Sequence, residues 1–323
     1  MSKNTIRNIE KSDRNKCILS NLPKTEFCIL MLNWNTTKDT IEALESMKKL
    51  EMNKMEVFLL FVGEKKEEIE RIQNVFPTIH IYQVPKNLGF AEGNNYLYRK
   101  AIAMFDPKYI LLLNTDVVVK ENLLSTLSKI LENDPNIGIA GVTNYYYHDP
   151  SKIWYNGGKI NKISGTTSHV EDKISTERLY QETGYVVGSC LAIRTEIVRK
   201  LAEIFDSKLF SYTEDVDLNL NVQELGYKTV VTSRTSILHK VSPVAPKNTP
   251  FRMFFESRNR ILVMRRHTDT LGFLVFITNF LIFKIPIWII RVIVSGNISS
   301  VAAIFKGVLD GLGLISSNSD YTK

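Results

Sequence analysis

The chain has 323 residues, enough for one large domain or two small ones. Apolar residues make up 44% and charged residues 23%, which supports a sizeable core and excludes wholesale disorder. The formal net charge is +7, and residues 246–323 alone carry ten basic and four acidic side chains. The rest of the chain is therefore close to neutral. This excludes a generally basic nucleic-acid-binding protein and places the cationic surface in the last quarter of the chain.

Cys17, Cys28 and Cys190 are widely spaced and form no Cys-x-x-Cys pair, which favours a reducing compartment over a disulfide framework or a zinc site. The N-terminal residues are polar and lack the apolar stretch of a secretory signal. We predict a flexible tail over 1–25, a main folded domain over 26–245, and basic and apolar membrane-associated helices over 246–323.

From Phe27 onward, predicted strands alternate with predicted helices. Continuous apolar runs, which are typical of buried parallel strands, are each followed by a helical segment. Repeated units of this length predict an α/β fold with a parallel sheet covered on both faces, and ligands bind such sheets beyond the carboxyl ends of the strands. The predicted strands are 27–32, 57–62, 79–83 and 109–113, and the predicted helices are 36–47, 65–76 and 94–104.

The second half of the chain is less regular. Residues 136–182 are rich in Tyr, Asn, Gly, Ser and His, with weak periodicity that predicts irregular strands and an acceptor-facing loop. Further strands are predicted at 185–193, 229–232 and 235–238, a helix at 213–225 between the cap residues Thr213 and Gly226, and a basic helix at 251–266.

An apolar run near the C-terminus is long enough to cross a bilayer, since 271–294 would form a helix of about 36 Å. Its only charges, Lys284 and Arg291, share one helix face, and Trp288 suits a membrane interface. We therefore favour a monotopic helix at the inner face of the cytoplasmic membrane, and a spanning helix and a buried helix stay open. The predicted basic patch for an anionic membrane surface comprises Arg252, Arg258, Arg260, Arg265 and Arg266.

Residues at three places in the sequence suggest metal-binding or acid–base chemistry at the ends of strands and helices. Asp116 follows a predicted strand, where a carboxylate can hold a divalent cation against a diphosphate; a turn-forming aspartate is the alternative. Glu214, Asp215 and Asp217 lie in the first turn of a predicted helix, where one could take a proton from an attacking hydroxyl; an ordinary acidic first turn is the alternative. His239 is either a packing residue or, as a neutral imidazole, a ligand of the same metal.

A fourth segment, 86–95, contains Gly89 and Gly93, which let the backbone approach a ligand closely. It lacks the Gly-Lys-Ser/Thr sequence of a complete phosphate-binding loop. A plain turn from a strand into a helix is the alternative.

Together and in this order, these segments resemble family 2 glycosyltransferases, with the rhamnosyltransferase-like branch nearest. The resemblance covers about residues 27–266. It implies a GT-A fold with a mostly parallel central sheet, an inverting reaction, a nucleotide-diphosphate sugar donor, and Mg²⁺ or Mn²⁺. The segments that carry it are Leu32–Asn35, Lys86–Asn95, Leu113–Asp116, Gly188–Arg194 and Tyr212–Leu218, with His239.

The resemblance also implies a role for each matching position. Asp116 matches the metal-binding aspartate, and His239 matches the histidine that helps to hold the metal and the diphosphate. Asp215 matches the catalytic base, with Glu214 beside it. The donor-binding positions are Asn33, Trp34, Asn35, Lys86, Asn87, Gly89, Asn94, Asn114 and Asp116.

One position departs from the family pattern. The family usually has an aspartate after the second strand that recognises a pyrimidine base, and this chain has Gly63 there. Three alternatives are open: Glu64 recognises the base, the backbone alone recognises it, or donor binding is degraded.

The resemblance predicts an inverting glycosyltransferase that moves rhamnose or another hexose to a lipid-linked saccharide in cell-surface polysaccharide or glycan assembly. A catalytically weak or silent membrane scaffold of the same fold would explain Gly63, although the intact Asp116, Asp215 and His239 argue against it. A sugar nucleotidyltransferase would need a glycine-rich, basic loop after the first strand, and Asn33–Thr37 has neither glycine nor arginine.

Overall fold

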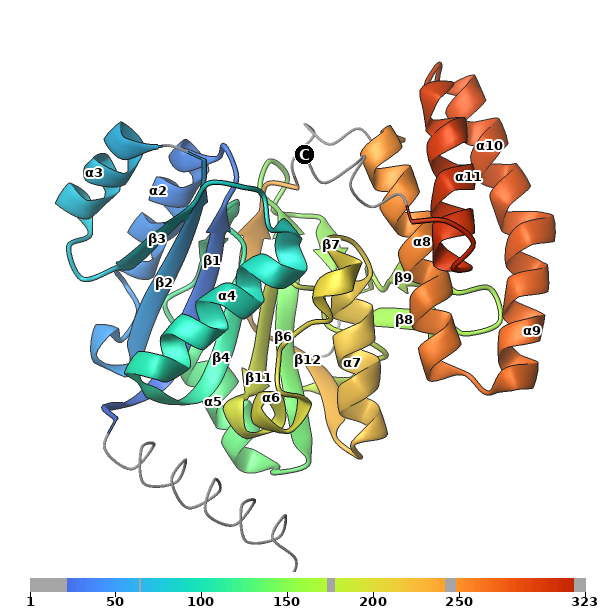
Figure 1. Cartoon of the computed structure of the whole chain (residues 1–323). Helices are drawn as coiled ribbons and strands as arrows, with labels where there is room; N and C mark the ends of the chain where they lie inside the picture. The colour runs from blue at the N-terminus through green and yellow to red at the C-terminus, as the bar shows by residue number, and fades with distance from the viewer. Residues whose placement is uncertain (1–21, 64, 173–177, 242–247, 317–323) are drawn as a thin grey trace, which may run out of the picture.

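The computed structural model describes residues 22–63, 65–172, 178–241 and 248–316 (Figure 1). Nearly all the predicted tail, Cys17 and Glu64 lie outside these residues, and the first strand already begins at Lys24. The strands and helices predicted in the first half are confirmed, but α4 begins at Gly89, five residues before the predicted start. These elements are β1 Lys24–Asn33, α2 Thr37–Met47, β2 Met55–Val62, α3 Lys66–Val75, β3 His80–Val84, α4 Gly89–Met104 and β4 Asp106–Leu113.

The second half is more regular than predicted. The run expected as irregular strands contains β6, which is buried on both faces from Ile137 to Asn144 and therefore shows no alternation. The two short strands predicted after α7 form one strand, β12, with a register shift between Thr232 and Ser236. The elements are β5 Val117–Val119, α5 Leu123–Asn133, β6 Ile137–Tyr146, β7 Ile153–Tyr155, β8 Gly158–Asn161, β9 Thr166–His169, β10 Gln181–Glu182, β11 Cys190–Arg194, α6 Thr195–Leu201, α7 Glu214–Glu224 and β12 Lys228–His239.

The central sheet has the strand order β10-β12-β6-β11-β4-β1-β2-β3. Its neighbours pair in parallel except β11, which runs antiparallel to both β4 and β6, and the edge strand β10. The prediction of a mostly parallel sheet is therefore confirmed. One apolar cluster joins the sheet to α2, α3 and α5, and a second joins it to α4, α6 and α7, so helices cover both faces (Figure 1).

Four helices form a separate layer beside the sheet (Figure 1). A third apolar cluster, which includes Val216 of α7, Met264 of α8 and Trp288 of α10, joins this layer to the α/β domain. We propose that the catalytic unit extends through α8 rather than ending at residue 245. The helices are α8 Pro250–His267, α9 Thr270–Asn279, α10 Ile285–Val294 and α11 Ser299–Gly311, with a single π-helical stretch, Phe280–Lys284, between α9 and α10.

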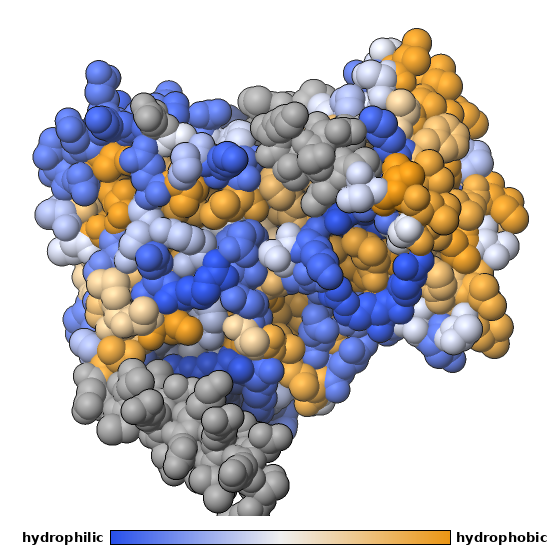
Figure 2. Space-filling model, viewed as in Figure 1, coloured by the Kyte–Doolittle hydropathy of each residue, from blue (hydrophilic) through white to orange (hydrophobic). Residues whose placement is uncertain are grey.

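The continuous helix Thr270–Val294 is 25 residues long, and its most apolar window has a mean hydropathy of 2.2, so by length and composition it could cross a membrane. Only 22% of its most apolar window is buried, which does not fit a core helix. Figure 2 shows a largely apolar surface along α9 and α10, whereas the surface of the sheet domain is a mixture of polar and apolar areas. The most exposed apolar side chains there are Leu271, Ile282, Phe283, Ile290 and Val294.

The predicted basic patch is wrong in most of its members. Arg258 is buried against Asp310, with an Nε–Oδ1 distance of 2.7 Å. Arg252 pairs with Glu256, and Arg266 pairs with acidic side chains of the α/β domain. From the sequence, a run of arginines on one helix is expected to face solvent. However, α8 packs between two layers, and most of its arginines pair with acidic side chains of the protein. The exposed Arg265 remains, stacked on Phe273 of α9.

Candidate functional site

Asp116 and His239 lie side by side, although 123 positions separate them in the sequence. The short strand β5 pairs antiparallel with the end of β12 and sets His239 opposite Val117. The backbone N–H of Lys240 donates to the carbonyl of Asp116 at 2.9 Å, which extends this antiparallel pairing by one more hydrogen bond. As a result, the Nε2 atom of His239 lies 3.3 Å from Oδ1 of Asp116.

The chemistry of this pair suits a divalent cation. Burial alone would raise the pKa of Asp116, but hydrogen bonds from His239 and Asn114 hold it below its ordinary value, so this carboxylate is ionised at neutral pH. The Nδ1 atom of His239 is buried without a hydrogen-bond partner. Carboxylate oxygen and imidazole nitrogen are both ligands of Mn²⁺, and carboxylate is one of Mg²⁺. No cluster of three or more His, Cys, Asp or Glu side chains suited to a metal occurs within the described ranges, so a cation here would need ligand oxygens to complete its shell.

A cavity of about 520 Å³ opens at the carboxyl ends of β1, β2 and β4. Asn35 and Lys86, two of the predicted donor-binding residues, are exposed and do not line it. The predicted residues that line it are Asn33, Trp34, Asn87, Gly89, Asn94, Asn114 and Asp116.

Several of these residues also have structural roles. The Oδ1 atom of Asn33 accepts the N–H of Thr36 before α2, and Oδ1 of Asn87 accepts the N–H of Gly89. The Nδ2 atom of Asn94 donates to the carbonyl of Phe90. Gly89 has a φ of +73°, and a Cβ atom there would lie 2.4 Å from the carbonyl oxygen of Phe210. A glycine is therefore needed at the start of α4 because the chain packs closely there. This fits the alternative interpretation of the segment as a turn from a strand into a helix.

A second cavity, of about 410 Å³, adjoins the first and is lined by Glu214 and Asp215 of α7. Phe90, Asn114 and Ser211 line both cavities. Asp116 lines the first cavity and its neighbour His239 lines the second, so this pair stands at the boundary between them.

Glu214 and Asp215 share the second cavity but differ in their surroundings. Burial and the nearby Asp215 raise the pKa of Glu214 to about 8, and its Oε2 atom is buried without a partner. Burial also raises the pKa of Asp215, yet its oxygens accept the N–H groups of Gly188 at 3.2 Å and Val216 at 2.8 Å, which favour the ionised form. Asp215 therefore gives up its proton more readily than Glu214.

This difference predicts that Glu214→Gln makes stability less dependent on pH. A folded carboxyl with a raised pKa binds its proton more tightly than the unfolded chain does, so it lowers stability as pH rises from about 4.5 to about 8. Denaturation midpoints measured at several pH values should show that the stability of Glu214→Gln increases relative to that of the wild type as pH rises across this range. Glu196→Gln, which alters an exposed glutamate of α6, should follow the wild type. Parallel curves for Glu214→Gln and the wild type would contradict the raised pKa.

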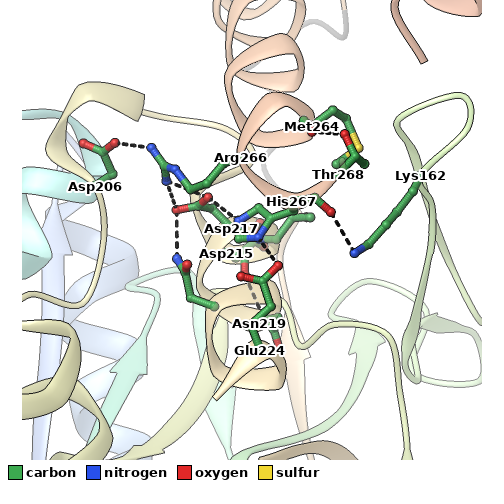
Figure 3. A network of polar contacts seen from close by, with 12 residues as sticks. Lys162, Asp206, Asp215, Asp217, Asn219, Glu224, Met264, Arg266, His267 and Thr268 are labelled. Atoms are coloured by element: carbon green, nitrogen blue, oxygen red, sulfur yellow. Dashed lines mark hydrogen bonds and ion pairs between the residues drawn. The ribbon is translucent and has the colours of Figure 1, made fainter. Parts of the chain in front are cut away.

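The third acid of the predicted triad, Asp217, lines neither cavity. Both of its oxygens lie 2.7 Å from Nη1 of Arg266, and Oδ1 lies 2.9 Å from Nε2 of His267 (Figure 3). His267 also contacts Glu224 through Nδ1 at 2.7 Å, and Arg266 reaches Asp206. Asp217 therefore ties α7 to the end of α8.

The turn before α7 has an unusual backbone. Phe210, Tyr212 and Thr213 have positive φ values of 62°, 67° and 74°, which are costly for residues with side chains. Thr213 is the N-cap residue as predicted, but its side chain makes no capping bond. Such strain persists only where the surroundings hold it, and here α8 does so.

Asn259 of α8 holds this turn. Its Nδ2 atom lies 2.7 Å, 2.9 Å and 2.7 Å from the carbonyl oxygens of Leu209, Ser211 and Tyr212. Asn259 is fully buried, so no water replaces these bonds if the amide is removed. It is a positioning residue for the acids that follow.

Accordingly, Asn259→Leu should lower both stability and turnover. A buried acceptor left unpaired costs about 1–3 kcal/mol, and the turn that sets the direction of Asp215 loses its anchor. Urea unfolding and steady-state rates would measure the two effects. Ser257→Ala is the matched control, because Ser257 is buried on the same helix but bonds only to carbonyls of α8 and α11. Full turnover in folded Asn259→Leu would show that the turn needs no anchor.

Sequence reasoning assigned no role at the site to several residues that line the second cavity. Trp154 contacts the rings of both His239 and His169, with centroid distances of 4.6 Å and 4.7 Å. Arg252 and Arg260 line the cavity from α8. The composition of 136–182 indicated an acceptor-facing loop, but nothing in the pattern marked which aromatic or basic residue would face the cavity.

Gly63 stands at the end of β2 with a φ of +81° and no atom within 4 Å of the position of a Cβ. Its carbonyl accepts Nε2 of Gln83 at 2.6 Å. Because Glu64 lies outside the described residues, its predicted part in base recognition stays a prediction.

The sheet order, the ends of its strands and the two adjoining cavities fit the GT-A-like fold that the sequence resemblance implies. The profile of the family described as "Glycosyltransferase like family 2" matches residues 23–266. The chain therefore belongs to this family of glycosyltransferases. A curated relative, the uncharacterized protein y4gI of Sinorhizobium fredii (strain NBRC 101917 / NGR234), is 26% identical over 155 residues, which are 45% of this chain but only 17% of that protein.

Solved glycosyltransferases share the fold. GalNAc-T7, solved with UDP, GalNAc and Mn²⁺, is 15% identical with a TM-score of 0.55 over 68% of this chain and 44% of that chain. The mannosyltransferase PcManGT from Pyrobaculum calidifontis, in complex with GDP-Man and Mn²⁺, is 11% identical with a TM-score of 0.54 over 97% and 84%. S. aureus TarS 1–349 is 12% identical with a TM-score of 0.56 over 90% and 83%. At these identities the similarity shows the fold alone.

Proposed function

We propose that the protein is an inverting glycosyltransferase that moves a hexose from a nucleotide-diphosphate donor to a saccharide acceptor. The observation that carries the proposal is the pair of adjoining cavities, one with Asp116 and the other with Asp215, with Asn114 in the wall of both. A single displacement needs the leaving diphosphate and the attacking hydroxyl on opposite sides of the anomeric carbon. Two cavities that meet at one wall suit that arrangement.

In this proposal the donor binds in the first cavity and the acceptor in the second. The acceptor oxygen forms its bond to the anomeric carbon as the bond to the diphosphate breaks, and Asp215 accepts the hydroxyl proton. The neighbouring carboxyl, Glu214, stays protonated and does not compete as a base. Asp116 and His239 would hold Mg²⁺ or Mn²⁺, which when bound neutralises charge on the departing diphosphate. Rhamnose is the sugar that the sequence resemblance favours.

A thermal-shift screen of the whole chain against nucleoside diphosphates tests the proposal. A ligand that binds only the native state raises its apparent stability, so we expect a shift with one diphosphate that requires Mn²⁺ or Mg²⁺. Because Gly63 offers no side chain to the base, the screen includes uridine, thymidine and guanosine compounds. The matching nucleotide sugar should then be slowly hydrolysed.

Two outcomes would favour the alternatives. Binding of the nucleotide sugar with no hydrolysis and no transfer indicates a silent scaffold. A response to a nucleoside triphosphate together with a sugar phosphate indicates a nucleotidyltransferase.

The exposed helix Thr270–Val294 supports a membrane location for the acceptor. Arg265, Lys284 and Arg291 lie on or beside it, with no ion pair to any described residue, and each basic residue near an anionic leaflet contributes about 1 kcal/mol. We propose that this helix lies in the inner face of the cytoplasmic membrane and that the acceptor is lipid-linked. The enzyme would then act in the assembly of a cell-surface polysaccharide or glycan.

Flotation with anionic vesicles should recover the whole chain with the lipid. The double variant Ile282→Asp/Phe283→Asp should float poorly, because both side chains are more than half exposed, at 58% and 61%, on the apolar face. Met52→Asp is the matched control, since Met52 is 50% exposed on the α/β domain. Alkaline carbonate should release part of the bound wild-type protein. Full retention after carbonate would instead indicate a spanning helix.

A further inference from the structure

The second cavity contains a cation without a carboxylate partner. Arg260 lines this cavity from α8, and its Nη1 atom donates to the carbonyl of Gly165 at 2.7 Å. Its Nε atom is buried and has no partner, and no described carboxylate forms an ion pair with its guanidinium. A guanidinium has five N–H donors, so Arg260 retains donors for an anion.

The nearby charges do not neutralise Arg260. Glu256 lines the same cavity, but it pairs with Arg252 at 2.6 Å between Oε1 and Nε. Burial lowers the pKa of Arg260, so its surroundings already disfavour an uncompensated charge. Arg260 is half-buried with its Nε atom fully buried, and a cation in such surroundings is stabilised when an anion joins it.

A second cation, Lys284, lies near Arg260, and its charge acts on the same surroundings. The guanidinium of Arg260 is 5.2 Å from the ring centroid of Trp288, and Nζ of Lys284 is 5.8 Å from the same centroid. Lys284 makes no ion pair with any described residue. Burial lowers the pKa of Lys284, and the charges of Arg260 and Arg291 lower it further. Two like charges therefore lie against one indole ring, which belongs to the apolar helix Thr270–Val294.

From these contacts we infer that Arg260 and Lys284 form a subsite for a phosphate group on the acceptor, next to Trp288. The inference rests on the proposed function and names the acceptor class as a saccharide joined to a lipid through phosphate. Arg260 does not line the cavity of Asp116, so the donor diphosphate does not meet its charge. The phosphate would lie between Asp215, where the sugar reacts, and the exposed face of α10, where Ile287 and Ile290 can contact the lipid chain.

Calorimetry with the whole chain in detergent tests the subsite with two probes, farnesyl phosphate and farnesol. They share the apolar chain and differ in the phosphate. The wild type should bind farnesyl phosphate at least about tenfold more tightly than farnesol, since charge-assisted hydrogen bonds to a phosphate are strong. In Arg260→Gln the two affinities should become nearly equal.

Two further variants separate the subsite from general effects of charge and folding. Arg265→Gln removes the same charge from the same helix at an exposed position outside the cavity, and it should keep the preference. Lys284→Gln should reduce the preference severalfold without touching the bonds that Arg260 makes in the fold. If Arg260→Gln does not fold, Lys284→Gln decides the test.

Three results would overturn the inference. They are equal binding of both probes by the wild type, an unchanged preference in both Arg260→Gln and Lys284→Gln, and Arg260-dependent binding of a glucuronic acid saccharide in place of farnesyl phosphate. The last would mean that the anion is a carboxylate of the acceptor sugar. Binding of a nucleoside diphosphate with Mn²⁺ is measured alongside: if it is absent while the phosphate preference persists, the proposed function fails and the subsite stands.

Discussion

Replacing Asp215 with asparagine is expected to lower turnover by about 10²–10⁴-fold, the usual contribution of general base catalysis. The side chain keeps its shape, but Gly188 and Val216 donate to different oxygens of Asp215, so the single amide oxygen keeps one of these two bonds. In the proposed function the donor and the metal bind in the neighbouring cavity, so their affinities should be unaffected. Steady-state transfer rates and calorimetry with the nucleoside diphosphate would measure the two quantities separately.

Glu214→Gln is the matched control for this prediction. The raised pKa of Glu214 keeps its carboxyl protonated at neutral pH, so an amide resembles its working state and the loss of turnover should be much smaller. The second oxygen of Glu214 already lacks a partner, so the amide removes no hydrogen bond from it. If Glu214→Gln is the more damaging change, Glu214 is the base and Asp215 only supports it.

The sequence predicts the sheet well because its strands are buried on both faces. Apolar runs such as Phe27–Leu32 and Val57–Val62 are long and uninterrupted, and each precedes a helical segment of the length that a parallel crossover needs. The rule that ligands bind beyond the carboxyl ends of such strands then places Asp116 at the candidate site. By contrast, the pairing of Asp116 with His239 depends on β5, whose three residues carry too little pattern to predict an antiparallel partner.

The helix α8 shows why the rest of the site was missed. In sequence, Arg258, Asn259 and Arg260 look like the polar face of a basic helix. In the structure Arg258 pairs with Asp310, Asn259 holds the turn before α7, and Arg260 lines the second cavity. Whether a polar residue of a helix faces water or a neighbouring layer depends on what packs against it, and local periodicity does not contain that information.

The final prediction concerns Asp116→Ala, which should abolish the metal dependence of donor binding and leave the fold intact. The carboxylate lies at a strand end and bonds mainly to His239, so its loss should cost only about 1 kcal/mol of stability. With only Asp116 and His239 available as protein ligands at this edge of the described sheet, removing one should weaken metal-assisted binding at least about 10–100-fold, the loss seen even for outer-shell partners of metal sites.

Calorimetry with the nucleoside diphosphate, with Mn²⁺ and with a chelator, would measure the effect of Asp116→Ala. The wild type should lose affinity when the metal is removed, and the variant should bind weakly in both conditions. Glu121→Ala, which removes an exposed carboxylate five positions along the chain, should behave like the wild type. Metal-dependent binding that survives in Asp116→Ala would move the cation away from Asp116 and leave His239, with its unpartnered Nδ1 atom, as a packing residue against Trp154.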